Sequence, residues 1–513
     1  ALLLLSLIAS RSRFGPLAGG ALALVGDSSL ALLRGYGESW HALGVGSSRA
    51  GHPFSALLGI FGLSTGGNPS IFVGALFVLA PVLAMLTMYL LIRKNGIGQL
   101  IAVTSALLYG TSAILLTSVS VGYLSTVLFL IFAPLVVLVF QPIFARESAT
   151  MSWRRTCASA LALSLLAALS IPALVFAVLV FVAHLWTLRS DQNLFRRRAA
   201  QYLVIVFGTF LALAPWSLSH LTSPQYLFLD QGVPVALSAP IHVLSGNFQP
   251  SGAVPGYVVS IALVIGVVAL FSRRAVNEGL IILGSLALAA LVSAISIAPY
   301  GNSLSSPLWP GGFLVISTLF STFALARLSE GRRKRLQESP LGRAHFATAL
   351  IAVIAVYSVS TNIFWWIVDG NRTPVRTVST SVLPAFIATA TDNPDRPKTL
   401  ILRSEERDQV QSFAYVVLRE RDIWMSELAS LPDEVPLLTK TIGEITAGVG
   451  DAPAARLAEF GIRYLYLENG KQNNSLARKI DGIGGLTRLS ATSDGILWQV
   501  SGSTSRIRFQ PQS

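Results

Sequence analysis

Long apolar runs separated by short charged segments dominate the first 370 residues of the chain. Runs long enough, or nearly long enough, to cross a bilayer lie at residues 71–92, 99–117, 123–141, 156–170, 172–188, 201–218, 255–271, 279–298, 311–326 and 345–368. The proline that follows Ser170 and Ile171 predicts a tight helical hairpin, because proline is tolerated at a helix start and not in its interior. The pattern predicts a polytopic α-helical membrane protein with about 10 to 12 spans.

Positive charge alternates along the connections between these runs. The clusters are Arg93 and Lys94; Arg146, Arg154 and Arg155; Arg189 with residues 196–198; Arg273 and Arg274; and residues 331–335. The loops at 221–254 and 299–308 contain no Lys or Arg. Because basic residues near helix ends are retained in the cytoplasm, the alternation predicts a multi-pass protein of the cell membrane. It places the outer loops 27–68 and 221–254, and everything after Asp369, outside the cytoplasm.

The first 55 residues allow two topologies. Residues 14–26 are short for an ordinary span, so either they cross as a short helix, or residues 1–10 end a crossing and the rest lies at the outer surface. Both place residues 36–53 outside. The opening "ALLLLSLIAS" has neither the basic region nor the cleavage pattern of a signal peptide, and we expect it to be the end of a helix in a longer protein.

Residues 370–513 have the mixed composition of a soluble α/β domain, whereas residues 1–369 form the membrane domain. Strands are predicted at 398–403, 412–419, 462–468 and 495–502, and helices at 437–448, 455–461 and 474–484, each ending near a glycine. The segment has no phosphate-binding glycine loop, metal-spaced His/Cys set or nucleophile elbow. An accessory role is therefore favoured over a catalytic one, no metal is expected, and the sequence leaves any cofactor unknown.

Composition agrees with the pattern. Hydrophobic residues make up 52% of the chain, charged residues 12%, and the mean hydropathy is +0.62. A net charge of +13 could indicate nucleic-acid binding, but the arginines cluster between apolar runs, where they set orientation. No nucleic-acid partner is expected. The single cysteine, Cys157, can form no internal disulfide and fits a small core residue.

Four short motifs occur in a fixed order. They are "GESWHALGVGSS…GHPFSALLGIFGL" after "GGALAL", "APW" at 214–216, "SPLWPGGFLV" at 306–315, and a terminal "LWQV". Together they resemble the multispanning region that follows a cytoplasmic family-two glycosyltransferase domain in many actinobacterial proteins. More broadly, the chain is similar to polytopic GT-C-like glycosyltransferases that use polyprenyl-phosphate sugars. The resemblance implies that a nucleotide-sugar-using domain precedes residue 1 in the full-length protein.

The resemblance also implies an acidic residue in the first outer loop that takes the proton from the attacking hydroxyl. Either Glu38 or Asp27 could be this base. A lipid-phosphate leaving group needs positive charge or hydrogen-bond donors, and the candidates are Arg34, Arg49, His41 and His52. Further candidates for substrate binding are Trp40, Asp230, His242 and Trp309.

Each candidate also has a structural explanation. Asp27 could cap the helix that "DSSLALL" predicts, and Glu38 could pair with Arg34. An interfacial aromatic belt is the simpler explanation for most of Trp40, Trp216, Trp309, Trp365 and Trp366. His184 is expected to form a helix-to-helix hydrogen bond, and Asp230 and His242 could be surface residues.

Two functions remain open at the sequence level. The first is a membrane glycosyltransferase of bacterial cell-envelope glycan assembly, which handles a lipid-linked sugar donor or a glycan acceptor at the outer face. The second is a non-catalytic transporter or scaffold for lipid-linked sugars made by the preceding domain. Such transporters often show internal repeats and charges buried within spans, and neither is evident here, so the enzyme is favoured. The expected partners are membrane lipids and a lipid-linked sugar or glycan; the sequence does not specify the sugar, acceptor, lipid carrier or oligomeric state.

Overall fold

The chain folds into two compact units. The computed structural model describes residues 2–11, 13–41, 45–144, 152–222, 227–233, 235, 257–272, 275–297, 306–336, 343–370, 373–377, 397–407, 410–418, 435–450, 452–468, 474–492 and 495–502. Unit 1 comprises the described residues of Ala1–Leu33, His52–Ile297 and Ser306–Thr377. Unit 2 comprises Arg34–Gly51 and the described residues after Thr377. His242 lies outside the described residues.

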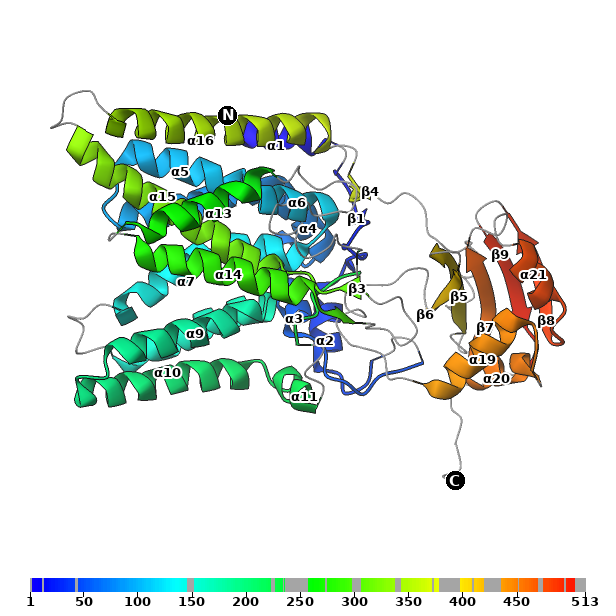
Figure 1. Ribbon diagram of the computed structural model, residues 1–513. Helices are drawn as coiled ribbons and strands as arrows, with labels where there is room; N and C mark the ends of the chain where they lie inside the picture. Colours follow the sequence, from blue (N-terminus) through cyan, green and yellow to red (C-terminus); the bar gives the residue numbers. More distant parts are fainter. Residues whose placement is uncertain are drawn as a thin grey trace. The chain divides into compact units, whose positions relative to one another are not determined.

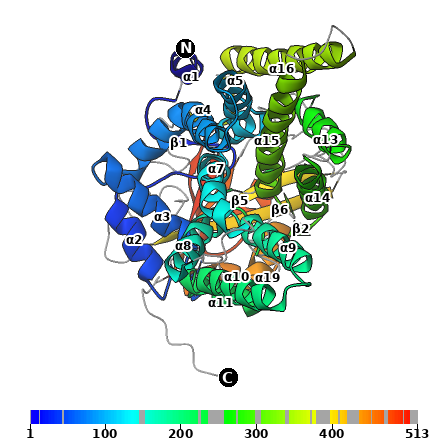
Figure 2. The ribbon, with the colours of Figure 1, turned by 90° about the vertical axis from the view of Figure 1, so that its left-hand side faces the viewer.

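Unit 1 is a helical bundle (Figures 1 and 2). Its helices are α1 (Leu2–Ala9), α2 (Ser29–Gly37, which continues into unit 2), α3 (Pro53–Gly62), α4 (Pro69–Lys94), α5 (Gln99–Gly110), α6 (Ala113–Val121), α7 (Leu124–Phe144), α8 (Trp153–Leu169), α9 (Pro172–Thr187), α10 (Gln192–Ala212), α11 (Trp216–Thr222), α13 (Tyr257–Leu270), α14 (Val276–Ser293), α15 (Gly311–Leu336) and α16 (Arg343–Val368). Figure 2 looks along the bundle and shows α7 inside it, where α7 contacts α4, α6, α8 and α15. The long helices follow the predicted apolar runs closely.

Five described segments are long and apolar enough to cross a membrane. They are Pro69–Lys94, Gln99–Val121, Leu124–Phe144, Val276–Ser293 and Gly311–Gly331. The chain is therefore a multi-pass membrane protein. The count of 10 to 12 spans stays a prediction.

Two predicted runs are interrupted by polar residues or proline. The run at 99–117 is divided between α5 and α6, because Thr111 and Ser112 leave the helical conformation. The run at 201–218 begins earlier than predicted, since Asp191 caps α10 by accepting a hydrogen bond from the Leu194 amide at 3.0 Å. It also ends earlier, at Ala212, and α11 follows Pro215. The predicted hairpin at Ser170 is confirmed, with α8 ending at Leu169 and α9 starting at Pro172.

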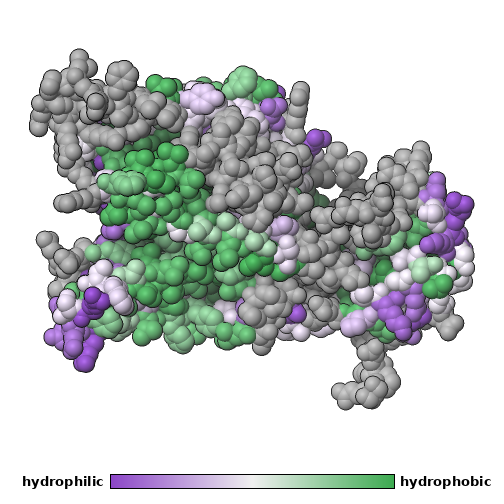
Figure 3. Space-filling view, in the orientation of Figure 1, coloured by the Kyte–Doolittle hydropathy of each residue, from purple (hydrophilic) through white to green (hydrophobic). Residues whose placement is uncertain are grey.

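Polar contacts join several helices of the bundle. The predicted hydrogen bond of His184 is confirmed, since its Nδ1 lies 2.5 Å from the hydroxyl of Tyr202 and joins α9 to α10. Arg327 on α15 pairs with Glu278 on α14. Exposed arginines, including Arg189 and Arg196, gather where α9 meets α10, and Figure 3 shows this end as hydrophilic beside a hydrophobic helical surface. We call this end of unit 1 the arginine end.

Three tryptophans contradict the predicted interfacial belt. Trp216, Trp309 and Trp366 are buried inside unit 1. Trp366 packs with Ala9 of α1 and with Leu116 of α6, so it joins the first and last described helices of the unit. A large indole in a position near a helix end predicts an interface, but here tertiary contacts cover it.

Unit 2 contains a five-stranded mixed sheet with the order β6-β5-β7-β9-β8. The strands are β5 (Lys398–Arg407), β6 (Val410–Leu418), β7 (Ile462–Glu468), β8 (Leu486–Ala491) and β9 (Gly495–Val500), and the helices are α19 (Pro436–Ala447), α20 (Pro453–Glu459) and α21 (Asn474–Asp481). Only β5 and β7 pair in parallel among these strands. The helices and one sheet face bury a core that includes Leu465, Leu467 and Trp498. All predicted elements are present, and β8 is an additional strand.

The polar stretch before Pro53 belongs to this second unit. Val45 packs against the core of the sheet domain, and the Lys398 ammonium donates a hydrogen bond to the Val45 carbonyl at 3.2 Å. The sheet domain therefore includes a segment more than 300 residues earlier in the chain. The predicted soluble domain, residues 370–513, did not include this segment.

Candidate functional site

A strap formed by residues 13–28 crosses the end of unit 1 at which α4, α7 and α15 begin, which we call the loop end (Figure 1). At the start of the strap, the buried guanidinium of Arg13 donates through Nη2 to the Gly370 carbonyl at 3.0 Å and to Thr373 Oγ1 at 2.7 Å. Burial lowers the pKa of Arg13 to about 10, which leaves it charged at neutral pH. The next residues form β1 (Leu17–Ala18), which pairs with β4 (Arg376–Thr377). The first half of the strap is thus fixed to the segment after α16.

The middle of the strap is fixed at Ala21. Its amide donates to the Val121 carbonyl at 2.7 Å, and its own carbonyl accepts from the Val233 amide at 2.9 Å. Gly20 before it has a φ of +60°, and a Cβ atom there would lie 2.2 Å from the Val121 carbonyl oxygen. Only glycine fits this conformation and this close approach. The "GG" of the sequence therefore lets the strap reach the α6–α7 connection and so fixes the chain ahead of Asp27.

Asp27 lies near the end of the strap, and its carboxylate has no hydrogen-bond partner among the described residues. It was expected to be the cap of α2, but the cap is Ser28, whose Oγ accepts from the Ala31 amide at 3.2 Å. This correction follows from position, since a cap accepts from an amide two or three residues further along the helix. Asp27 is exposed and accepts no hydrogen bond from the described residues. Its carboxylate is therefore available to a ligand.

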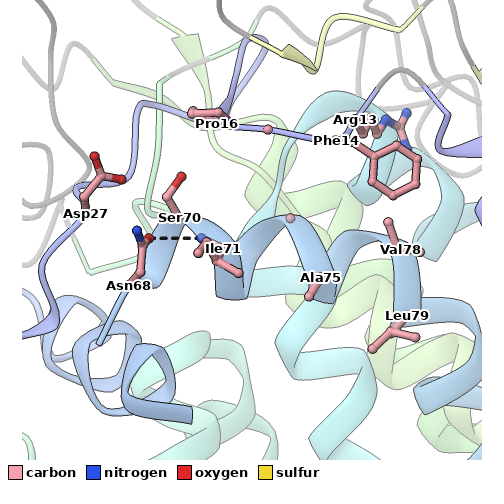
Figure 4. Close-up of a pocket in the computed structure, with 12 residues that line it drawn as sticks. Arg13, Phe14, Pro16, Asp27, Asn68, Ser70, Ile71, Ala75, Val78 and Leu79 are labelled. Atoms are coloured by element: carbon pink, nitrogen blue, oxygen red, sulfur yellow. Dashed lines mark hydrogen bonds between the residues drawn. The ribbon is translucent and has the colours of Figure 1, made fainter. Parts of the chain in front are cut away.

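A groove of about 440 Å³ runs from Asp27 along α4 (Figure 4). Asp27, Asn68 and Ser70 line one end, and Asn68 caps α4 by accepting from the Ile71 amide at 3.1 Å. The rest of the wall consists of strap residues 13–16 and, on α4, Ile71, Gly74, Ala75, Val78 and Leu79. From Ser70 to Leu79 the helix rises roughly 13 Å. A polar mouth that leads into a largely apolar trough, in which Arg13 is the charged exception, suits an amphiphilic ligand.

A second acid, Asp230, lies where α7 begins. Its Oδ1 accepts a hydrogen bond of 2.6 Å from the hydroxyl of Ser125. Burial of the carboxyl group raises its pKa to about 7, although the Ser125 hydroxyl and the Gln231 amide act in the opposite direction. Asp230 thus fixes the segment that also holds the strap at Ala21, and its role in substrate binding stays a prediction.

Trp309 lies beside the same connection. Its indole stacks on the ring of Tyr123, with centroids 3.8 Å apart and planes 5° apart, and its Nε1 donates to Thr126 Oγ1 at 2.9 Å. The "SPLWPGG" motif, which contains β3 (Ser306–Pro307), is thereby attached to the start of α7. β3 pairs with β2 (Ser296–Ile297) after α14. Trp309 is buried at this junction, so the structure gives it a packing role that the sequence did not indicate.

The titration of Asp230 leads to a prediction about stability. A carboxyl pKa that is higher in the folded than in the unfolded state stabilises the fold below about pH 4, and this contribution is lost as the pH rises to about 7. We therefore expect the unfolding temperature of the purified protein to fall over this range. Asp230→Asn, which cannot ionise, should reduce that fall by roughly 2–4 °C in thermal unfolding followed at several pH values. Identical pH dependence in the two proteins would show that Asp230 does not titrate in this range.

His52 forms a buried cluster with two aromatic side chains. Its Nδ1 accepts from the Phe54 amide at 3.1 Å and so caps α3. Its ring meets Trp216 edge-on at 4.3 Å, and Trp216 lies 4.3 Å from the ring of His220. Burial, and secondarily His220, hold the pKa of His52 well below its usual range. His52 is therefore a neutral helix cap, and its contact with a lipid phosphate stays a prediction.

The remaining candidates lie in unit 2. Arg34, Glu38 and Trp40 are exposed, and no ion pair joins Arg34 to Glu38 in the described structure. His41 is buried; burial lowers its pKa, and the Glu38 carboxylate acts in the opposite direction. The backbone amide of Arg49 bonds to Ser47 Oγ at 3.2 Å. Within unit 1, the structure thus forms two groups of candidate residues, one around Asp27 and one around Asp230.

Several residues at the site gave no recognisable signal in the sequence. Ser125 and Tyr123 lie within or beside an apolar run, and Arg13 preceded a segment of uncertain topology. Asn68, followed by Pro69 and an apolar run, does carry the pattern of a helix cap, and it could have placed the mouth of the groove. The contacts between the strap and distant segments depend on the tertiary fold.

Comparison with known proteins finds solved structures with a similar fold. No protein-family model and no curated protein sequence matches the chain. The cryo-EM structure of arabinofuranosyltransferase AftD from Mycobacteria matches with a TM-score of 0.59 and 16% identity over 98% of this chain and 40% of that one. Archaeal oligosaccharyltransferase AglB from Archaeoglobus fulgidus, in complex with an inhibitory peptide and a dolichol-phosphate, matches with a TM-score of 0.53 and 12% identity over 96% of this chain and 73% of that one.

Both matches are GT-C glycosyltransferases, and the chain has their fold. The resemblance of the sequence to polytopic GT-C-like proteins is confirmed at this level. The chain spans about 40% of the length of the mycobacterial arabinofuranosyltransferase.

Proposed function

We propose that the chain is a membrane glycosyltransferase of bacterial cell-envelope glycan assembly that transfers a sugar from a lipid-linked donor to a glycan acceptor. The observation that carries the proposal is the carboxylate of Asp27, which is free of the helix cap and lies at the polar mouth of a groove on a membrane-spanning helix. The GT-C fold supports the same reaction class. The dolichol-phosphate in the similar archaeal structure supports a polyprenyl-phosphate carrier.

In the proposed reaction, a hydroxyl of the acceptor attacks the anomeric carbon of the donor sugar. Asp27 accepts the hydroxyl proton as the new glycosidic bond forms. The bond between the anomeric carbon and the phosphate oxygen breaks, and the lipid phosphate leaves with the electron pair. The hydroxyl of Ser70 and the positive end of the α4 dipole lie at the same end of the groove and favour an anionic group there.

The apolar part of the groove gives the lipid chain a place to bind. The α4 face from Ile71 to Leu79 provides hydrocarbon contacts over roughly 12 Å, enough for the first isoprene units of a carrier. Among the candidate bases, Asp27 is therefore preferred to Glu38, because Asp27 lines this groove.

Membrane orientation is part of the proposal. The absence of Lys and Arg from the loops at 221–254 and 299–308 supports placing the loop end of unit 1 outside the cytoplasm, with the arginine end inside. The C-terminal sheet domain is then extracytoplasmic. Chemistry at this face suits a donor that is delivered on a lipid rather than as a soluble nucleotide sugar.

A transfer assay in proteoliposomes tests the function. With polyprenyl-phosphate arabinofuranose as donor and an arabinan oligosaccharide as acceptor, we expect a lengthened oligosaccharide. The corresponding nucleotide sugar should give no product. Movement of the lipid-linked sugar between leaflets without any transfer would favour the transporter or scaffold instead.

A further inference from the structure

The most exposed aromatic residue of unit 2's early segment is Trp40, which is 55% exposed. It ends a stretch, residues 37–40, in which every residue is exposed. Leaving more than half of an indole in contact with water sacrifices the hydrophobic free energy that its burial would give. An exposed tryptophan in a structured loop therefore suggests a ligand surface.

The described residues that follow Trp40 are held in place by several contacts. His41 and Ser47 exchange two backbone hydrogen bonds of 2.8 Å. Val45 packs on the core of the sheet domain and accepts the hydrogen bond from Lys398. The base of the loop is thus part of the folded domain.

The indole of Trp40 lies against Gly46. Gly46 has a φ of +126°, and a Cβ atom there would lie 2.0 Å from Cζ2 of Trp40. The indole therefore lies directly on the glycine backbone, which a larger residue would not permit. A side chain that is held in one orientation before binding loses little conformational entropy when a ligand arrives.

Polar residues precede the exposed ring in the sequence. Ser39 and Glu38 immediately precede Trp40, and both are exposed. The carboxylate of Glu38 accepts no hydrogen bond from the described residues. An apolar ring face beside a hydroxyl group and a carboxylate matches a sugar ring, which presents one face of C–H groups and a rim of hydroxyl donors.

We infer that Trp40 and Glu38 form a carbohydrate-binding platform on unit 2, in which the indole stacks on a sugar ring and the carboxylate accepts hydrogen bonds from its hydroxyls. The ligand class is a neutral oligosaccharide. The inference rests on the proposed function for its assignment to the glycan acceptor. The binding itself requires no catalysis.

A membrane-interface role is the competing explanation, and Trp186 shows what that environment looks like in this chain. Trp186 is 69% exposed at the arginine end, and the guanidinium of Arg189 lies 4.8 Å from its ring. Tryptophan beside arginine suits lipid headgroups. Trp40 instead has a carboxylate two residues away, which opposes contact with anionic lipid.

Titration of the full chain in detergent with arabinopentaose, followed by calorimetry, tests the platform. We expect Trp40→Ala to weaken binding by about tenfold and Trp40→Phe to weaken it less, because a phenyl ring retains part of the stacking. Glu38→Gln should weaken binding several-fold. The matched control, Trp186→Ala, should bind as the unmodified chain does.

Unchanged binding in Trp40→Ala would overturn the inference. So would a loss of affinity for sugar-free anionic vesicles in Trp40→Ala with glycan affinity retained, because that result identifies a membrane contact. Failure here is distinguishable from failure of the proposed function, since transfer that depends on Asp27 can persist without the platform. Conversely, glycan binding through Trp40 in a chain without transferase activity would leave the platform intact.

Discussion

Asp27→Asn is expected to lower the turnover number for sugar transfer by about 10²-fold or more, the usual contribution of a general base. Asparagine preserves the size of the side chain and its hydrogen-bonding oxygen but has no basicity. Because Ser28 rather than Asp27 caps α2, the substitution removes no cap and should leave the fold intact. The measurement is the initial rate of transfer at saturating donor and acceptor, with the unfolding temperature recorded in parallel.

Two variants control this experiment. Ser28→Ala removes the actual cap, so it should cost about 1 kcal/mol of stability while leaving turnover nearly unchanged. Glu38→Gln should retain turnover, since its role in the account is to bind acceptor. If Glu38→Gln abolished turnover and Asp27→Asn did not, the base would be Glu38.

Gly74→Leu is expected to raise the KM for a long-chain polyprenyl-phosphate donor by about tenfold or more. The added side chain would project into the apolar part of the groove and displace the lipid there. The helix should tolerate it, because a Cβ atom at Gly74 meets only the Gly15 carbonyl oxygen at 3.8 Å and leucine has the higher helix propensity. A donor with a single isoprene unit should be affected much less.

Gly284→Leu on α14 is the matched control. This glycine also lies within a helix, and a Cβ atom there meets nothing within 4 Å, but it borders no part of the groove. Gly284→Leu should leave the KM unchanged for both the long-chain donor and the donor with a single isoprene unit. If Gly74→Leu affected the long and short donors equally, the groove would not be the site of the lipid chain.

The elements of the fold were largely predictable from the sequence. The long helices follow runs of apolar residues because a membrane span must satisfy its backbone hydrogen bonds internally and present hydrocarbon outside. Gly448, with a φ of +75°, ends α19 where the predicted helix stopped. β8 was missed because "LTRLSA" has a single buried residue at its start and is otherwise largely exposed.

The arrangement of the site was much less predictable. Asp27 was recognised as a candidate base. Whether its carboxylate is used as the cap of α2 depends on where the helix begins, and in the structure Ser28 is the cap. Asp230 meets Ser125 across a separation of 105 residues, and Ala21 meets Val121 and Val233. Contacts between segments so far apart follow from the packing of the bundle, which local patterns do not specify.

The assignment of residues 34–51 to the sheet domain also depends on contacts between distant segments. Hydropathy placed this stretch beside the membrane because it lies between apolar segments. Its attachment through Val45 and Lys398 depends on a surface that forms only when the C-terminal strands fold. Local sequence patterns therefore gave no sign that Val45 packs against the sheet domain.

A structure of the Asp27→Asn variant with a bound polyprenyl-phosphate sugar tests the central claim most directly. A base lies about 3 Å from the attacking oxygen, which in turn lies about 3 Å from the anomeric carbon. We expect the anomeric carbon to lie within about 6 Å of the side chain at position 27, with the first isoprene units against Ala75 and Val78. A sugar bound elsewhere, with the groove on α4 filled by no part of the donor, would contradict it.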